Sequence, residues 1–182
     1  MQPRLILNSK HFEITINRLC YQLIENHGDF SESAIIGLQP RGLLLAQRIH
    51  KKLSHIFDNK KILIGNLDVT FFRDDFRRRE SPLLPNATQI EFLVENKKVI
   101  LVDDVLFTGR TIRAGLDAIL AFGRPAKVEL LTLIDRRYSR HLPIEPNYVG
   151  KSVDAIDSEN VKVNWEEVEG EDQVWLLSSK EK

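Results

Sequence analysis

The residues best suited to chemistry lie in one stretch, VILVDDVLFTGRT, which runs from Val99 to Thr111. It begins with apolar residues, continues with the paired acids Asp103 and Asp104, and ends in a small polar loop. The loop is suited to an anion, because backbone N–H groups at the start of a helix point outward at its positive dipole end. Two carboxylates directly before such a loop would repel a phosphate, and this conflict needs an explanation.

The loop offers several hydrogen-bond donors. Its backbone N–H groups, from Phe107 onward, and the hydroxyls of Thr108 and Thr111 can donate to a phosphate monoester. The side chain of Arg110 adds a positive charge, and Gly109 lets the backbone approach the ligand closely. The simpler alternative is an ordinary helix start, capped by Asp or Thr with a glycine in its turn, and the spacing alone does not separate the two.

The acid pair separates these interpretations better than the loop does. A helix cap needs one acid and leaves the other unexplained. A carboxylate is a poor neighbour for phosphate but accepts hydrogen bonds from hydroxyl groups, so the pair indicates a ligand with a diol near its phosphate. A ribose 5-phosphate fits that description, with its hydroxyls at Asp103 and Asp104 and its phosphate at the loop.

The whole chain sets the limits for such a site. Its 182 residues suit one domain that buries roughly 70% of its extended surface, so folding needs no metal or disulfide. The 26 basic and 26 acidic residues cancel, so the overall charge predicts no polyanionic partner. Cys20 is the only cysteine, which excludes an intrachain disulfide and a multi-cysteine zinc site. There is no apolar run of membrane-spanning length and no secretory-signal core, so we expect a cytoplasmic protein without a membrane partner.

The elements that must position the loop alternate between strands and helices. Short apolar runs predict buried strands, and apolar residues at three- and four-residue steps predict helices. This order predicts an α/β fold with a mostly parallel sheet, whose ligands sit beyond the carboxyl ends of the strands. In chain order we expect a helix opened by Asn8 or Ser9 and stopped by Gly28, a strand at 34–38, a helix from about 43 to 56, a strand-like run at 61–72, a strand at 98–102, a turn at 103–111, a helix at 112–122, a strand at 128–134, and short strands at the sheet edge around 161–165 and 173–177.

Several stretches resemble one protein family. VILVDDVLFTGRT is similar to the phosphoribosyl-pyrophosphate motif of type I phosphoribosyltransferases, which combines an apolar strand, an acid pair and a Thr-Gly-x-Thr loop. GLQPRG, at 37–42, resembles the pyrophosphate loop of the family. DVTFFRDD, at 68–75, and DRRYSRHLPIEPNYVGK, at 135–151, resemble a branch whose members combine uracil phosphoribosyltransferase activity with attenuation of pyrimidine operons.

The resemblance spans nearly the whole chain and implies a fold and a reaction. The implied fold is the type I phosphoribosyltransferase fold, an α/β fold in one domain at 1–182 with a central, mostly parallel sheet flanked by helices. A small hood, formed by about 135–160 and the C-terminal strands, and a flexible lid loop within 73–91 complete it. In the implied reaction uracil and phosphoribosyl pyrophosphate give UMP and pyrophosphate, with Mg²⁺ as cofactor.

The resemblance also assigns roles to residues. Asp103, Asp104 and Arg73 are the implied catalytic residues, and Mg²⁺ is held by the substrate and reached through water by Asp103 or Asp104. Their contribution is mainly electrostatic, so neither acid needs to be a strict general base. The ribose and the 5-phosphate are assigned to Asp103, Asp104, Phe107, Thr108, Gly109, Arg110 and Thr111, and the pyrophosphate to Gln39, Pro40, Arg41, Gly42 and Arg73.

The base has to be inferred from the resemblance, because the motif contacts only the sugar phosphate. The branch likeness favours uracil, read by the segment after Asp135, with Ile134, Arg136 and Arg137 as the candidate residues. The ordinary interpretation of such arginines is solvent-exposed surface, and Arg41 considered alone would be interpreted in the same way. A transferase for a purine base is the alternative within the family.

A regulator that senses UMP or UTP and binds the leader RNA of pyrimidine operons is the alternative from another class. In this branch the RNA surface includes a Thr, an Arg and a His of the first helix and a Lys of the pyrophosphate loop. Arg18 matches, but Asn17, Tyr21 and Gln39 stand at the other three positions, and the zero net charge gives no basic excess. We therefore favour the transferase. The resemblance also implies a homodimer.

Overall fold

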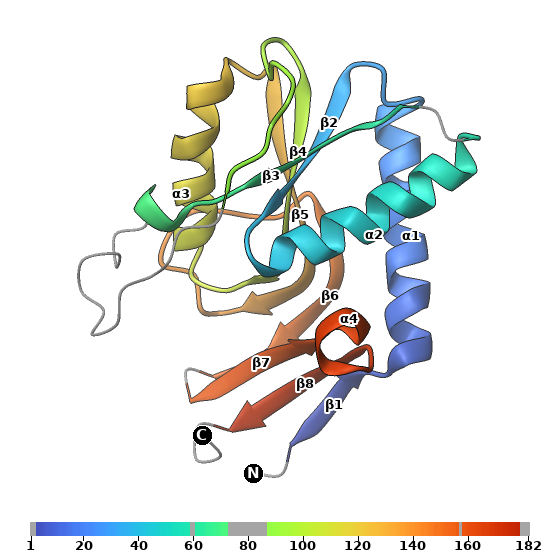
Figure 1. The fold of residues 1–182 in the computed structure, drawn as a ribbon. Coiled ribbons are helices and arrows are strands. Elements are labelled where there is room, and N and C mark those ends of the chain that lie inside the picture. The colour runs from blue at the N-terminus through green and yellow to red at the C-terminus, as the bar shows by residue number, and fades with distance from the viewer. Residues whose placement is uncertain (1–2, 59–60, 73–86, 157, 179–182) are drawn as a thin grey trace.

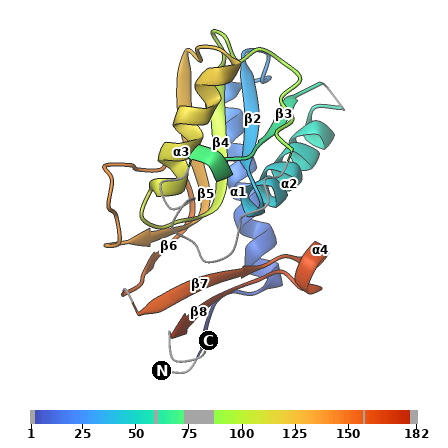
Figure 2. The same ribbon diagram turned by 60° about the vertical axis from the view of Figure 1, so that its left-hand side comes forward.

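The computed structural model describes residues 3–58, 61–72, 87–156 and 158–178. A five-stranded sheet forms its centre, helices cover both faces of that sheet, and a separate three-stranded sheet lies at one end (Figures 1 and 2). In chain order the elements are β1 (Arg4–Leu7), α1 (Ser9–His27), β2 (Ser33–Leu38), α2 (Arg41–Ile56), β3 (Leu63–Leu67), the 3-10 turn η1 (Thr70–Phe72), β4 (Lys98–Leu106), α3 (Arg110–Ile119), the 3-10 turn η2 (Leu120–Phe122), β5 (Lys127–Arg137), β6 (Tyr148–Asp154), β7 (Glu159–Asn164), α4 (Glu166–Glu169) and β8 (Gln173–Ser178).

The central sheet has the strand order β3-β2-β4-β5-β6, and every neighbouring pair is parallel. Successive side chains of a strand point to opposite faces. On β2, Ile35 packs in the core formed with α1 and α2, and Ile36 packs in the core formed with α3. The apolar runs of the strands are those expected when helices cover both faces. The predicted fold class is confirmed, and the carboxyl ends of the strands meet at one edge.

Helix α1 begins and ends where the sequence predicts. The Oδ1 atom of Asn8 accepts a hydrogen bond from the backbone N–H of His11 at 2.9 Å, which caps the first turn. Gly28 follows the last turn with a φ of +56°, a conformation that L side chains rarely adopt. The buried face of α1 includes Phe12 and Leu19 and packs toward the sheet. Among the described residues, no helix combines the length and the apolar character needed to cross a membrane.

Strand β4 extends further than its sequence predicts. We expected it to end at Val102, with the acid pair in a turn, but β4 continues to Leu106. The backbone pairing with β5 continues as well, from Asp103 opposite Thr132 to Leu106 opposite Asp135. The predicted turn was wrong because two successive acids carry no local sign of the neighbouring strand that holds them extended. The acid pair is therefore fixed by the sheet itself.

The C-terminal strands form a sheet of their own. We expected them at an edge of the central sheet, but β7 pairs with β8, and β8 pairs with β1. The fully buried Trp165 holds this second sheet to α1, since its ring meets the ring of Phe12 edge-on at 5.2 Å between centroids. Strand β6 lies within the segment expected for the hood, yet it joins the central sheet beside β5.

Candidate active site

The acid pair, Asp103 and Asp104, lies near the carboxyl end of β4, where the parallel sheet opens toward the second sheet. The backbone N–H of Asp104 donates to Oδ1 of Asp103 at 3.0 Å. Burial raises the pKa of the Asp104 carboxyl to about 6, although the positive charge of Arg41 and backbone N–H donors act in the opposite direction. The surroundings of Asp104 thus do not fully compensate its charge.

The anion loop, residues 107–111, follows β4 and includes the first two residues of α3. Gly109 stands at the N-cap of α3 with a φ of +88°, and no side chain caps the helix there. The nearest substitute is the Thr108 hydroxyl, which lies 3.4 Å from the backbone N–H of Arg110. The helix-cap interpretation is therefore wrong for the acids, and of the expected cap only this long Thr108 contact is seen among the described residues. A helix start without a strong side-chain cap is suited to an anion.

The start of α2 lies directly against the acid pair because residue 42 is a glycine. A Cβ atom on Gly42 would lie 2.3 Å from the carbonyl oxygen of Val102 and 2.9 Å from Cα of Asp103. Any other side chain would force α2 and β4 apart. The close approach brings the GLQPRG segment to the carboxyl edge, so the two stretches that resemble family motifs meet in space.

Two residues of that segment make specific contacts. Gln39 bonds to the segments beside it, since its backbone N–H donates to the Leu67 carbonyl at 3.0 Å and its side chain donates to the Ala87 carbonyl at 2.8 Å. Arg41 points toward the second sheet. Its Nη1 donates to the carbonyl oxygen of Val163 at 2.6 Å, and its Nη2 lies 2.8 Å from Oε1 of Glu169.

Arg140 holds the anion loop in place, a role for which we did not single it out from the sequence. Its guanidinium donates to the Asp135 carboxylate and to the carbonyl oxygen of Phe107. Three further carbonyl oxygens accept from it, those of Leu106 at 3.2 Å, Arg136 at 3.2 Å and Ile144 at 3.0 Å. One side chain thereby joins the anion loop to the end of β5. Such a role depends on tertiary contacts and leaves no periodic signal in the sequence.

The three candidate residues for the base lie in different surroundings. Ile134 is fully buried in the core, so its side chain does not reach the edge of the site. Arg136 is buried against the loop, with its guanidinium 3.9 Å from the centre of the Phe107 ring. Arg137 turns away and bonds Asp154 of β6 at 2.7 Å. Only Arg136 adjoins the anion loop.

The remaining predicted residues fall elsewhere. Arg73 and the basic residues of the expected lid lie outside the described residues. Arg18 is exposed on α1, but its guanidinium donates to the carbonyl oxygens of Val149 at 3.1 Å and Gly150 at 2.5 Å. Tyr21, on the same helix, is 60% exposed.

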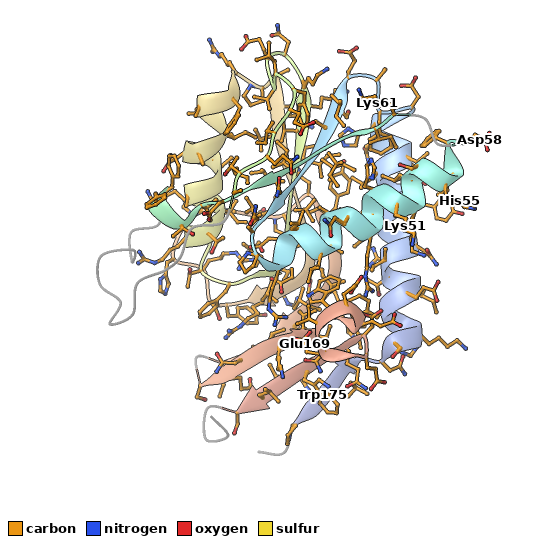
Figure 3. The ribbon with its side chains drawn as sticks, viewed as in Figure 1. Lys51, His55, Asp58, Lys61, Glu169 and Trp175 are labelled. Atoms are coloured by element: carbon orange, nitrogen blue, oxygen red, sulfur yellow. The ribbon has the colours of Figure 1, made fainter. Side chains whose placement is uncertain are left out.

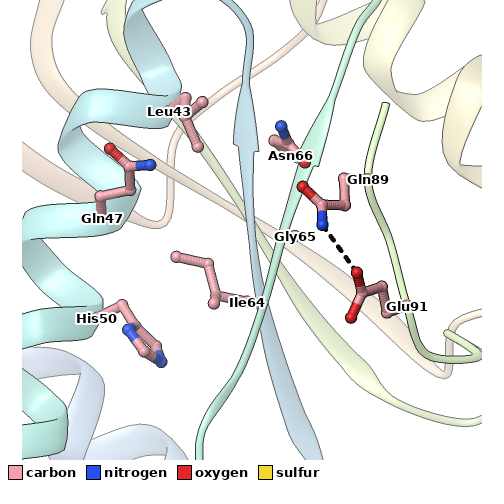
Figure 4. Close-up of a pocket in the computed structure, with 8 residues that line it drawn as sticks. All are labelled: Leu43, Gln47, His50, Ile64, Gly65, Asn66, Gln89 and Glu91. Carbon is pink, nitrogen blue, oxygen red and sulfur yellow. Dashed lines mark hydrogen bonds between the residues drawn. The ribbon is translucent and has the colours of Figure 1, made fainter. Parts of the chain in front are cut away.

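A separate cleft lies away from the acid pair. Figure 4 shows this cleft of about 410 Å³ between α2, β3 and the chain around Gln89. On one side of the cleft the side chain of Gln89 donates to the Glu91 carboxylate at 2.7 Å. No residue of the acid pair or the anion loop lines it, so it is separate from the candidate site. Its lining residues are Leu43, Gln47, His50, Ile64, Gly65, Asn66, Gln89 and Glu91.

Comparison with known proteins gives relatives of nearly the same length. The chain is 42% identical over 172 residues to "Bifunctional protein PyrR" of Gloeothece citriformis, which covers 94% of this chain and 96% of that protein. It is 43% identical over 169 residues to the protein of the same name from Desulfosudis oleivorans, with 93% of each chain covered.

Solved structures give the fold. A hypoxanthine phosphoribosyltransferase from Staphylococcus aureus has a TM-score of 0.69 at 19% identity and covers 97% of this chain and 93% of its own. The hypoxanthine phosphoribosyltransferase of Trypanosoma cruzi has a TM-score of 0.71 at 13% identity and covers 96% of each. The phosphoribosyl transferase domain family matches residues 5–168. The chain belongs to the phosphoribosyltransferase family, has its type I fold, and counts the PyrR proteins among its relatives.

Proposed function

We propose that the protein transfers the phosphoribosyl group of phosphoribosyl pyrophosphate to uracil, giving UMP and pyrophosphate. The observation that carries the proposal is the meeting of three features at one sheet edge. These are the acid pair at the end of β4, the start of α3 without a side-chain cap, and Arg41 at the start of α2. Together they offer carboxylates that accept hydrogen bonds from hydroxyl groups, N–H groups that donate to phosphate, and a positive charge, all within one site.

The proposed chemistry is mainly electrostatic. As pyrophosphate leaves, positive charge develops on the ribose at the anomeric carbon, and carboxylates close to the ribose stabilise it. Asp104, with a pKa of about 6, is mostly ionised at neutral pH and can accept hydrogen bonds from the ribose hydroxyls. The N–H groups at the start of α3 would hold the 5-phosphate while Arg41 meets the pyrophosphate.

The donor set suits a magnesium ion that arrives with its substrate. Mg²⁺ prefers oxygen ligands, keeps several waters, and is usually bound by one or two carboxylates together with substrate phosphates. Asp103 and Asp104 supply two carboxylates at the site, and no group of three or more potential ligands occurs among the residues that the structure describes. Bound there, Mg²⁺ would neutralise charge on the leaving pyrophosphate.

The choice of uracil rests on the likeness to the pyrimidine-operon branch and on the relatives that carry the PyrR name. The hypoxanthine phosphoribosyltransferases share only the fold, so they do not support a purine substrate. The test is an assay of pyrophosphate release from phosphoribosyl pyrophosphate and Mg²⁺ with uracil, hypoxanthine, guanine or orotate. We expect turnover with uracil alone, and a clear preference for another base would overturn the substrate.

Regulation by RNA binding is the second candidate, and the word "bifunctional" in the names of the relatives favours it. We rank it second because Arg18, the one match to the expected RNA surface, already donates to carbonyl oxygens of β6. Binding to a pyrimidine-operon leader hairpin, measured at several salt concentrations, tests it. Tight binding that increases with UMP would establish the regulator, whereas binding that is weak at low salt would exclude it.

We also propose that the protein is a homodimer, because the family resemblance implies one. Light scattering coupled to size exclusion measures the mass of the particle directly. A mass of a single 21.0 kDa chain across the concentration range of the assay would contradict the proposal.

A further inference from the structure

Helix α2 holds an acidic turn of the C-terminal region with two arginines. The acidic turn, residues 166–172, has the sequence EEVEGED and contains α4. Arg41 and Arg48 are seven residues apart on α2, which places them on the same face of the helix two turns apart. Each binds carboxylates of the acidic turn. In Figure 3, α4 with Glu169 lies between α2 and the second sheet.

The contact made by Arg48 is an anchor. Its guanidinium bonds both oxygens of Glu167, at 2.9 and 2.5 Å, and both oxygens of Asp172, at 2.6 and 2.8 Å. It also lies 5.1 Å from the centre of the Trp165 ring. Only 18% of the Arg48 side chain is exposed. Two carboxylates take four of the five N–H donors of this guanidinium and only a small part of it is exposed, so Arg48 fixes the acidic turn to α2.

The contact made by Arg41 is more open. Among the described residues Arg41 pairs with one carboxylate, that of Glu169, and 40% of its side chain is exposed. The other oxygen of Glu169 accepts from the backbone N–H of Trp165 at 2.7 Å, so the carboxylate is held in place by its own turn. The charges of both Arg41 and Glu169 act on Asp104. The ion pair therefore lies within electrostatic range of Asp104, and Gly42, the neighbour of Arg41 in the chain, packs closely against Asp103.

We propose that Glu169 is the resident counter-ion of Arg41, and that the pyrophosphate of the substrate displaces it. The inference rests on the proposed function, because it assigns the pyrophosphate to Arg41. Without ligand, one guanidinium is neutralised by a carboxylate that the fold holds still. An incoming pyrophosphate has to compete with that carboxylate, which lowers its affinity. Glu169 is a positioning residue: it keeps Arg41 at the site and promotes the departure of pyrophosphate after the reaction.

The variant Glu169→Gln tests this directly. The amide oxygen can still accept from the Trp165 N–H, but the side chain no longer neutralises Arg41. We expect the KM for phosphoribosyl pyrophosphate and the inhibition constant of pyrophosphate to fall together, by roughly two- to fivefold, the range for losing a partly exposed competing charge. The value of kcat should not rise, since pyrophosphate leaves more slowly.

The matched control is Glu167→Gln in the same acidic turn. It weakens the anchor at Arg48 and should lower the melting temperature while leaving the KM for phosphoribosyl pyrophosphate unchanged. An unchanged or raised KM in Glu169→Gln would overturn the inference, as would an equal fall of KM in the control. If the unaltered protein shows no turnover of phosphoribosyl pyrophosphate with any of the four bases, the proposed function fails instead. Calorimetry with pyrophosphate alone then still compares the two variants, and equal affinity for both would overturn the role of Glu169.

Discussion

Two buried polar clusters lie at opposite ends of the central sheet, and the pKa values of their carboxylates are shifted in opposite directions. At the amino ends of the strands, a closed cluster joins His27, Ser33, Glu129 and Tyr148. The Glu129 carboxylate accepts from Tyr148 at 2.8 Å and from Nε2 of His27 at 2.9 Å, and Nδ1 of His27 lies 2.8 Å from the Ser33 hydroxyl. At the carboxyl ends lies the acid pair.

The pKa values follow this difference. Burial acts to raise the pKa of Glu129, but hydrogen bonds from Lys127 and Tyr148 and the charge of His27 outweigh it and lower that pKa. Burial, together with the charges of Lys98 and Lys127, lowers the pKa of His27 below its usual value against the opposing effect of Glu129, so the ring is neutral near pH 7. At Asp104 burial outweighs its partners and the pKa rises to about 6. The lowered pKa of Glu129 is typical of a carboxylate that supports the fold, whereas on the proposed function the raised pKa of Asp104 belongs to a carboxylate that binds a ligand.

Removing charge from the acid pair should have the largest effect on activity. Asp104→Asn deletes a carboxylate from the proposed ribose site, and we expect turnover to fall roughly 10²- to 10³-fold. The melting temperature should not fall, because a carboxyl with a raised pKa costs stability when it is ionised at neutral pH. Steady-state kinetics and thermal melts measure the two effects. Near-normal turnover, or a marked loss of stability, would remove the distinction between the two clusters.

Removing charge from the closed cluster should do the opposite. Glu129→Gln leaves His27, Tyr148 and Lys127 without their carboxylate, and we expect unfolding to become easier by about 3 kcal/mol. The KM for phosphoribosyl pyrophosphate should stay the same in the folded protein. Denaturant melts give the stability, with Lys127→Met as the control. The Lys127 side chain is 60% exposed, so its loss should cost no more than ~1 kcal/mol. A large change in KM for Glu129→Gln would show that the two ends are coupled.

The pH dependence of stability should separate the clusters by sign. The pKa of His27 is lowered from 6.5, so the unfolded chain binds its proton first and the closed cluster loses stability as the pH falls below 6.5. The pKa of Asp104 is raised from 3.8 to about 6, so its protonation stabilises the fold as the pH falls through that window. Thermal melts from pH 7.5 to about 5 should show a steeper loss for Asp104→Asn than for the unaltered protein. Parallel curves would mean that Asp104 does not titrate in this way.

Local signals account for what could be predicted of the fold. The cap at Asn8, the stop at Gly28 and the apolar runs of the strands each lie within a few residues, so the sequence shows them directly. The second sheet could not be predicted, because β1 pairs with β8 across almost the whole chain, with Arg4 opposite Leu176. The sequence of a short strand does not indicate which distant segment it will pair with.

The candidate site likewise combines residues that could be predicted from the sequence with residues that could not. The acid pair and the anion loop are contiguous in the chain, so their residue types could be interpreted together. Glu169 meets Arg41 across 128 residues, and Arg140 gains its role from five acceptors on different segments. An acid in an acidic stretch and an arginine in a basic one are ordinary surface residues until the fold brings their partners to them.

The bonds of Arg140 have a consequence for selectivity. Because one guanidinium binds carbonyl oxygens of both the anion loop and the end of β5, these two parts cannot move independently. On the proposed function, the first part holds the phosphate and the second meets the base. The protein would then favour a nucleotide whose phosphate and base are separated by the distance that Arg140 fixes between these two parts.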